Sequence, residues 1–504
     1  MYLFLRMRNE NLYAEFHVAY KNLKNSHMKK GLYYISVSLG LLFFSCTKDI
    51  SSYNKETKRA ADVPAGTLFS NATRNLSDNL CSASVNLNPF RFIVKHWAMA
   101  TYQDEVQYDF STRNIPQSWW GGAYRDILND FKESARIINE DKTLQAGEKA
   151  NQLAIIDIMQ VYVFSNLVTT FGDIPYTQAL DAGNVNPVYD DAKTVYTDLL
   201  SRLASSISKL DAGSKGFSVA EDIVYKGSIA NWKKFANTLR VKLGMIIADS
   251  DPGTAKTNVE AADAGAFGSS ADDANFAYLS STPNTNPLYA DIVLGGRGDY
   301  LAAKDLMDQL IALDDPRKPL YFGKNNDGNY VGGIVGAVNT LAATSKPSSK
   351  VSEASAPGII LDYVELEFYR AEAKERGFNV SGTAADHYKN AIKSSIISWG
   401  GTDADATTYL AKSSVDYATA AGDWKTKIGL QKWIALYNRP MDGWLELRRL
   451  DKPVLSLPVG ARSGFPNRYQ YPNNEQQLNG KNYTAAASKI GGDEVETKLF
   501  WDKN

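Results

Sequence analysis

Apolar residues recur three and four positions apart over much of the chain, which is the spacing of one face of an α-helix. The segments with this spacing, and with charges between the apolar positions, are 119–138, 190–210 and 228–248. The segment 148–171 is apolar on nearly every side, which predicts a helix in the middle of a bundle. Gly172 and Pro175 follow it as stop signals. These patterns predict a mainly α-helical fold.

Helical spacing resumes after residue 360 and comes in pairs. The predicted helices are 362–376, 383–398, 424–437 and 441–451. Ala384, Tyr388 and Ala391 fall four and then three positions apart, as in the second helix of a tetratricopeptide unit. We therefore expect several tetratricopeptide-like helix pairs to form the scaffold.

The part between about 253 and 360 is rich in Gly, Ser, Asn and Pro. It predicts long irregular loops with one helix at 304–313 and a short strand at 359–361. Loops of this length in a compact domain are usually functional. The tail, 453–504, also predicts irregular structure, and we expect the long loops to lie on one face of the scaffold.

The N-terminal region predicts a lipoprotein signal. Met28-Lys29-Lys30 precedes an apolar run at 31–44, and the single cysteine Cys46 follows Ser45. The apolar run of about fourteen residues is too short to span a bilayer, which needs about twenty. An apolar core helix that ends in a chance cysteine is the alternative.

This interpretation divides the chain into three parts. Residues 1–45 form a precursor segment whose signal peptide has its core at 28–45, and translation can start at Met1 or Met28. Residues 46–65 form a flexible tether that is lipidated at Cys46. Residues 66–504 form a single α-helical domain, with the loop-rich insertion at about 253–360.

Composition narrows the class of function. Without 1–45 the chain has 49 basic and 54 acidic residues, which is unlike a nucleic-acid-binding protein. Cys81 has no partner if Cys46 is acylated, so no internal disulfide is expected. Only His96 and His387 remain, and the familiar hydrolase, metal and nucleotide motifs are missing. We expect no catalytic residue, no metal site and no cofactor, although a structural calcium ion and a carboxylate pair of the glycosidase type stay open.

Several motifs, taken together and in order, resemble the SusD/RagB family of outer-membrane nutrient-binding lipoproteins. They are Phe171-Gly172-Asp173-Ile174-Pro175-Tyr176, Tyr189-Asp190, Val195-Tyr196, the stretch 231–240, Asp314-Asp315-Pro316-Arg317, the helix 365–377, Pro466-Asn467-Arg468, Tyr471-Pro472, Glu475, Asn479 and Trp501-Asp502. The resemblance runs from Cys46 to about Asp502. Most of these residues also have a purely structural interpretation: Trp232 and Phe235 as core packing, and Asp315-Pro316-Arg317 as a turn with paired charges.

The resemblance implies a SusD-like fold and a lipid-anchored protein at the cell surface of the outer membrane. It also implies a partner, a SusC-like TonB-dependent transporter that the protein covers as a lid. The implied function is to bind a nutrient oligomer, most often a starch-like or other glycan and sometimes a peptide, and to deliver it without catalysis.

A glycan site needs aromatic rings that stack on the apolar faces of sugars, and amide, carboxylate or guanidinium groups that bind hydroxyls. Two loop segments have this composition, 97–114 and 278–299. The candidate ligand contacts are Trp97, Tyr102, Gln103, Tyr108, Phe110, Arg113, Asn114, Asn284, Asn286, Tyr289 and Arg297. Their location on loops held by a rigid scaffold is typical of binding residues.

Three alternatives stay open. A member of the same family can bind a peptide in place of a glycan. A secreted glycan-active hydrolase would show turnover that depends on one acidic residue. A tetratricopeptide scaffold that binds only protein would show no affinity for small ligands. The sequence does not select among glycans, because binding loops vary freely on one scaffold.

Overall fold

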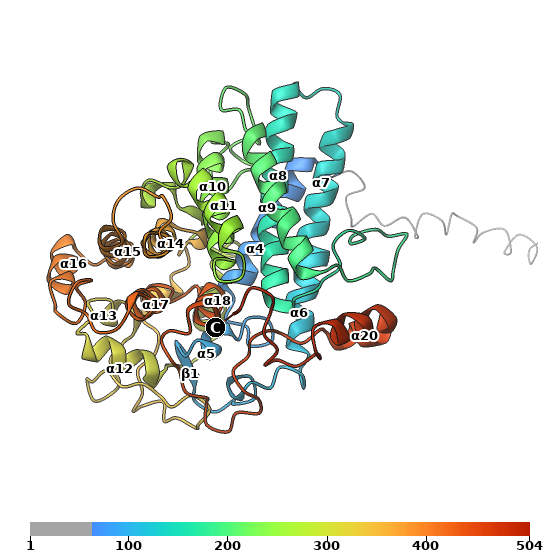
Figure 1. Cartoon of the computed structure of the whole chain (residues 1–504). Coiled ribbons are helices and arrows are strands. Elements are labelled where there is room, and N and C mark those ends of the chain that lie inside the picture. Colours follow the sequence, from blue (N-terminus) through green and yellow to red (C-terminus); the bar gives the residue numbers. More distant parts are fainter. Residues whose placement is uncertain (1–62, 504) are drawn as a thin grey trace, which may run out of the picture. The chain divides into compact units, whose positions relative to one another are not determined.

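The computed structural model describes residues 63–503, and it confirms the prediction of a mainly helical chain (Figure 1). The α-helices are α4 (Ala65–Cys81), α5 (Phe90–Ile93), α6 (Ile115–Gly121), α7 (Asn129–Glu140), α8 (Ala146–Phe171), α9 (Ala192–Lys209), α10 (Ile229–Ile246), α11 (Pro252–Ala262), α12 (Lys304–Ala312), α13 (Lys318–Tyr321), α14 (Tyr363–Glu375), α15 (Ala384–Ser398), α16 (Asp403–Leu410), α17 (Trp424–Ala435), α18 (Pro440–Leu450), α19 (Asn473–Leu478) and α20 (Gly480–Lys489). Two π-helical turns, η2 (Gly122–Leu128) and η5 (Tyr289–Leu294), and four short 3-10 turns complete the helical structure.

Helix α8 is the centre of the first group of helices. It packs against α7 and α9, and α4 packs against α7 (Figure 1). Within the described part of the chain, α8 is the one helix long and apolar enough to cross a membrane, but 78% of its most apolar window is buried inside the protein. The prediction of a central core helix is therefore confirmed. Gly172 ends α8 at φ 91°, a left-handed conformation that favours glycine.

The second half stacks helix pairs. Helix α14 packs against α15, α15 against α16, and α17 against α14 and α18. Tyr388 and Ala391, predicted at the spacing of a tetratricopeptide helix, are both buried on α15. The predicted core residues Trp232 and Phe235 are also buried, and their rings lie 5.4 Å apart.

Buried ion pairs join the helices of this half. Lys242 of α10 contacts Glu365 of α14 at 3.0 Å. Arg449 of α18 holds Glu372 of α14 through two hydrogen bonds of 2.6 and 2.5 Å. Bidentate Arg–carboxylate pairs fix relative orientation as well as distance, so these contacts align α10, α14 and α18.

Two short antiparallel ladders hold the loop-rich part. Strand β1 (Trp97–Met99) pairs with β3 (Tyr300–Ala302), and β2 (Ala274–Phe276) pairs with β4 (Gly358–Leu361). The strand predicted at 359–361 is therefore confirmed as β4. Both ladders join chain segments that are far apart in the sequence, which places the long loops against the helical scaffold.

The structure corrects the predicted elements in three places. Helix α4 begins at Ala65, where no helix was predicted. Helix α11 occupies the start of the region that was expected to be loop, with Asp251 accepting the Thr254 N–H as its N-cap. Helices α19 and α20 lie in the tail that was expected to be irregular. The predicted signal peptide, Cys46 and most of the tether lie outside the described residues.

Candidate functional site

The two predicted loop segments, 97–114 and 278–299, meet in the structure. The loop that leaves β1 and the loop that enters β3 become neighbours because the two strands pair antiparallel. The Ala100 N–H extends the ladder by donating to the Asp299 carbonyl at 3.0 Å. Side chains that are almost 200 residues apart in the sequence are thus brought to one surface.

Four of the predicted ligand contacts do not lie on that surface. The buried side chains, between 0% and 3% exposed, are Trp97, Tyr108, Phe110 and Asn286. Trp97 donates from Nε1 to Tyr437 Oη at 3.0 Å, and the ring of Phe110 packs against Tyr469. The Asn286 amide donates to a carbonyl of the neighbouring loop at 2.9 Å. These residues support the loops from inside, so the expectation that they present a face to a ligand is wrong.

Tyr102 has the opposite environment. It is 67% exposed, and it is the one exposed aromatic side chain in the described part of the chain, where the others are buried or half-buried. Gln103 next to it is half-buried, and its side-chain oxygen has no hydrogen-bond partner among the described residues. That oxygen is itself buried, so the exposed group here is the Tyr102 ring, which can stack on the apolar face of a sugar.

Two arginines act on one buried carboxylate, that of Glu105. Arg113 bonds to Glu105, and Arg297 contributes further positive charge to the same carboxylate. Burial raises the pKa of Glu105, and the two arginines oppose that shift. Arg297 is also held by Asp299 at 2.9 Å and lies 4.5 Å from the centre of the Tyr300 ring. Both guanidinium groups are thereby fixed while 34% and 25% of their side chains stay exposed.

The remaining predicted residues lie at the edges. The Asn114 side-chain oxygen accepts from the Asn473 N–H at 3.2 Å, so Asn114 faces α19. The Asn284 side-chain oxygen accepts from Arg74 of α4 at 2.8 Å. Tyr289 is half-buried in the π-helical turn η5, in which no residue is fully buried. We call the surface formed by Tyr102, Gln103, Arg113 and Arg297 the loop cluster.

Two further loops, residues 332–341 and 451–467, brace the loop cluster, and the sequence did not predict their part in it. Asn339 donates from its amide to the Met99 carbonyl at 2.9 Å, and Gln107 donates to the Gly336 carbonyl at 2.9 Å. The Arg462 N–H donates to the Gln107 carbonyl at 2.8 Å. The apolar side chains that these two loops expose are Ile334, Val338, Leu341, Val454, Leu457 and Val459.

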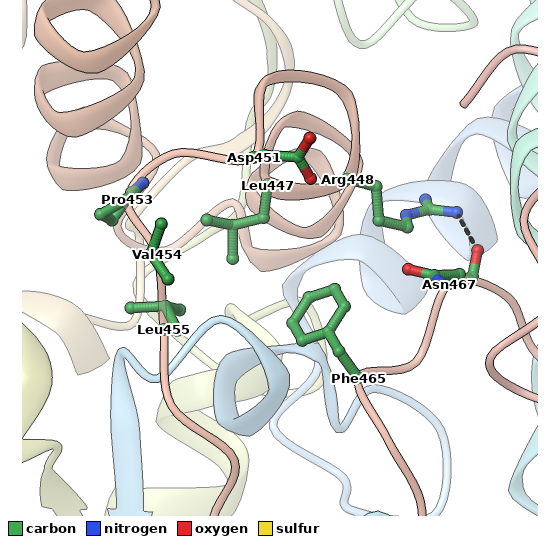
Figure 2. A pocket seen from close by; sticks show the side chains of 8 residues that line it. All are labelled: Leu447, Arg448, Asp451, Pro453, Val454, Leu455, Phe465 and Asn467. Atoms are coloured by element: carbon green, nitrogen blue, oxygen red, sulfur yellow. Dashed lines mark hydrogen bonds between the residues drawn. The ribbon is translucent and has the colours of Figure 1, made fainter. Parts of the chain in front are cut away.

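A separate hollow of about 240 Å³ lies where the second bracing loop leaves and rejoins the scaffold at the end of α18 (Figure 2). Figure 2 shows Leu447, Leu455 and Phe465 around it, with Arg448 turned towards the Asn467 carbonyl. Arg448 donates to that carbonyl at 2.9 Å. We call this hollow the apolar pocket; its walls suit an apolar group of a ligand more than a charged one.

The histidines of the described chain are engaged in structural contacts. Burial lowers the pKa of His96 to about 3, and His96 Nε2 lies 3.0 Å from the Trp433 carbonyl. His387 Nδ1 lies 3.0 Å from a carboxylate oxygen of Glu367. Over residues 63–503, no group of three or more His, Cys, Asp and Glu side chains has the arrangement of a metal site.

One signal could have separated buried from exposed candidates. Tyr108 and Phe110 follow Val106 at alternate positions, which is the pattern of a segment with one buried face. The bracing loops had no such signal, because their contacts to 97–114 use backbone carbonyls, which any sequence provides.

Comparisons with known proteins give one family. The family model named SusD-like, with the description "Starch-binding associating with outer membrane", matches residues 57–472. No curated protein sequence matches the chain.

Solved structures match over almost their full length. A chitin-binding protein is 26% identical, with a TM-score of 0.76, over 87% of this chain and 100% of that one. A chitin-binding SusD homologue from Flavobacterium johnsoniae is 23% identical, with a TM-score of 0.74, over 86% and 99%. A SusD-like protein from Bacteroides thetaiotaomicron is 23% identical, with a TM-score of 0.73, over 88% and 99%. The last two likenesses concern the fold.

Proposed function

Because the chain belongs to the SusD-like family, we propose that it is a non-catalytic lipoprotein of the cell surface that binds a nutrient oligomer. The ligand is an oligosaccharide, and the bound oligomer passes to a SusC-like TonB-dependent transporter. Lipidation at Cys46 anchors the protein in the outer membrane. The family description, which joins starch binding to the outer membrane, supports the class of ligand and the location.

The observation that carries the proposal is the exposed ring of Tyr102, on a loop segment that also holds the fixed guanidinium group of Arg113. An isolated exposed tyrosine is common, but this one follows the backbone contact between Ala100 and Asp299, on the same segment as the guanidinium of Arg113, which Glu105 holds in place. Orientation before binding reduces the entropy lost on binding. The name of the 26% identical relative makes chitin oligosaccharides the first ligands to test.

The test is calorimetry of the protein with chitin, starch and other oligosaccharides, comparing the wild type with Tyr102→Ala and Arg297→Ala. Loss of the Tyr102 ring should weaken binding by about 1–3 kcal/mol, the range for an aromatic anchor in a binding site. Val219→Ala is the control, because Val219 is 65% exposed and lies on the loop between α9 and α10. Full affinity in both loop-cluster variants would place the site elsewhere.

A peptide ligand is the second candidate, and the apolar pocket favours it. A hollow of about 240 Å³ with Leu447, Leu455 and Phe465 in its walls would accept an apolar side chain of a peptide. Val454→Asp would place a carboxylate at its mouth, where Val454 is 79% exposed. Binding of peptides that is lost in Val454→Asp and retained in Tyr102→Ala would favour this candidate over the oligosaccharide.

A further inference from the structure

A hollow of about 390 Å³ lies between α14, α15, the start of α16 and the turn before β2. It shares no lining residue with the loop cluster or the apolar pocket. We call it the helix-side cleft. Its volume lies within the range of about 300–1,000 Å³ that is usual for small-ligand sites.

A buried carboxylate orients the polar group at the edge of this cleft. Asn390 donates from its amide nitrogen to Glu367 at 3.0 Å, and Glu367 is held in turn by Arg370 at 2.9 Å and His387 at 3.0 Å. Since a carboxylate only accepts here, the amide has its nitrogen on Glu367 and its oxygen free. The cleft is therefore provided with an acceptor of fixed orientation.

Aromatic and aliphatic surfaces complete the wall. Tyr363 is half-buried at the start of α14, and its N–H donates to Asp273 at 2.7 Å, which fixes the first turn of the helix. Ile397 is 41% exposed and lies seven residues after Asn390, on the same face of α15. A ring and a branched aliphatic side chain thus line the cleft together with the amide.

The charges at the cleft compensate each other. Lys393 contacts Asp403 at 2.7 Å across its edge, and Ser394 adds a hydroxyl group. A strongly charged ligand would find no excess of opposite charge, whereas a neutral ligand with hydroxyl groups and apolar faces would find partners for both.

We infer that the helix-side cleft is a second binding site, which takes one or two rings of a neutral saccharide. Tyr363 and Ile397 contact the apolar faces of the rings, and Asn390 accepts a hydrogen bond from a hydroxyl or acetamido group. The inference rests on the cleft itself and does not require the loop cluster to be a saccharide site.

The experiment uses the full chain carrying Tyr102→Ala, with N,N'-diacetylchitobiose and maltose as probes in calorimetry. Ser394→Trp should fill the cleft and abolish binding there, and Asn390→Ala should weaken it on the order of tenfold by removing the acceptor. Asn139→Ala is the matched control, an exposed asparagine on α7. The Tm of each variant is measured before calorimetry. We expect it to be unchanged, because Asn390 and Asn139 are exposed and Ser394 lies at the edge of the cleft.

Loss of binding in Ser394→Trp and Asn390→Ala, with full binding in Asn139→Ala, supports the second site. If both cleft variants bind as well as the Tyr102→Ala parent, the inference is overturned, and the proposal for the loop cluster is judged by Tyr102→Ala alone. If Ser394→Trp removes binding from the otherwise wild-type chain while Tyr102→Ala has no effect, the second site stands and the loop cluster fails. A chain that binds neither probe overturns the inference.

Discussion

The contribution of a charged residue to the stability of this protein depends on how deeply its charge is buried. Arg317 and Asp315 form an ion pair with contacts of 2.6 and 2.9 Å, which confirms the predicted pairing of charges, and both side chains are fully buried. Arg317 also donates to Ser395 at 3.1 Å and to Gln431 at 3.0 Å. The guanidinium thus joins three segments of the second half of the chain.

Arg317→Met should lower the free energy of unfolding by about 3–5 kcal/mol, because it leaves Asp315 as a buried charge without its partner. Urea unfolding followed by fluorescence measures this. The double variant Asp315→Leu/Arg317→Met should recover part of the loss, since it removes both charges. A single variant as stable as the wild type would contradict the prediction, and Arg136→Ala, at an exposed pair, gives the baseline.

The raised pKa of Asp273 predicts that the stability of the folded protein depends on pH with a definite sign. Burial and the neighbouring Asp362 carboxylate raise the pKa of Asp273 to about 8, against about 3.9 for an unfolded chain. Between these values the folded protein holds a proton that the unfolded chain has released, so this group's contribution to stability falls as the pH rises from about 4 to about 8.

Asp273→Asn should therefore be more stable than the wild type at pH 8 and similar to it at pH 4. The side-chain oxygen of asparagine can still accept the Tyr363 N–H that Asp273 accepts at 2.7 Å. Thermal unfolding of both proteins at the two pH values measures the effect. Equal differences in Tm at pH 4 and pH 8 would show that Asp273 does not titrate in this window.

At the scale of elements, the loops owe their order to a few side chains. Asn339 binds three carbonyl groups through its amide nitrogen, at Met99, Ile334 and Ala337, and its oxygen accepts the Ile334 N–H at 2.8 Å. One side chain thus closes its own loop and attaches it to the end of β1.

Asn339→Ala should loosen this loop without unfolding the scaffold. Hydrogen exchange measured by mass spectrometry should become faster in peptides that cover 331–341 and 99–103, and should stay unchanged in α8 and α14. We expect the Tm to fall by only a few degrees, because the side chain contributes little to the main core. Uniformly faster exchange across the whole chain would instead show that the loop and the scaffold unfold together.

The scaffold could be predicted from the sequence more fully than the loops. The helices around α8 and α15 could be predicted because their apolar residues keep a regular spacing, and Tyr388 and Ala391 are buried as that spacing requires. Helices α4 and α11 escaped prediction because α4 lies beside the presumed tether and α11 begins in a Gly- and Pro-containing stretch. Helix α4 packs against α7, which lies about 50 residues further along the chain, whereas α11 packs against α10, which directly precedes it.

The loop cluster was predictable in part for a similar reason. Composition indicated the segments 97–114 and 278–299, and the ladder between β1 and β3 brings them together. Composition alone did not separate Tyr102, which is exposed, from Tyr108, which is buried. The alternation of Val106, Tyr108 and Phe110 indicated the buried face, whereas the packing of Phe110 against the distant Tyr469 leaves no local pattern.

At the scale of the whole molecule, residues 64–503 contain a continuous core that reaches from Phe69 of α4 to Trp501. The core draws on every helix from α4 to α18. We expect stability and ligand binding to be properties of this part alone, and membrane attachment to be a property of the lipid proposed at Cys46.

Cys46→Ser should separate these properties. Cells that express this variant should incorporate no labelled palmitate into the protein and should release it from the membrane fraction, because stable anchoring depends on the acyl chains. The purified variant should keep the Tm and the ligand affinity of the wild type. A variant that stays in the membrane fraction would show that something other than lipid holds the protein there.

The bracing of the loop cluster also sets the time at which it can form. The loop cluster includes Tyr102, Arg113 and Arg297. The second bracing loop is attached to the same region by the hydrogen bond from the Arg462 N–H to the Gln107 carbonyl. A ribosome that adds about 5–20 residues per second needs roughly 20–70 seconds to travel from the first of these positions to the last. The loop cluster can therefore be complete only after nearly the whole domain has been made. In the proposed cell-surface protein, this completion comes before or during exposure to the ligand outside the cell.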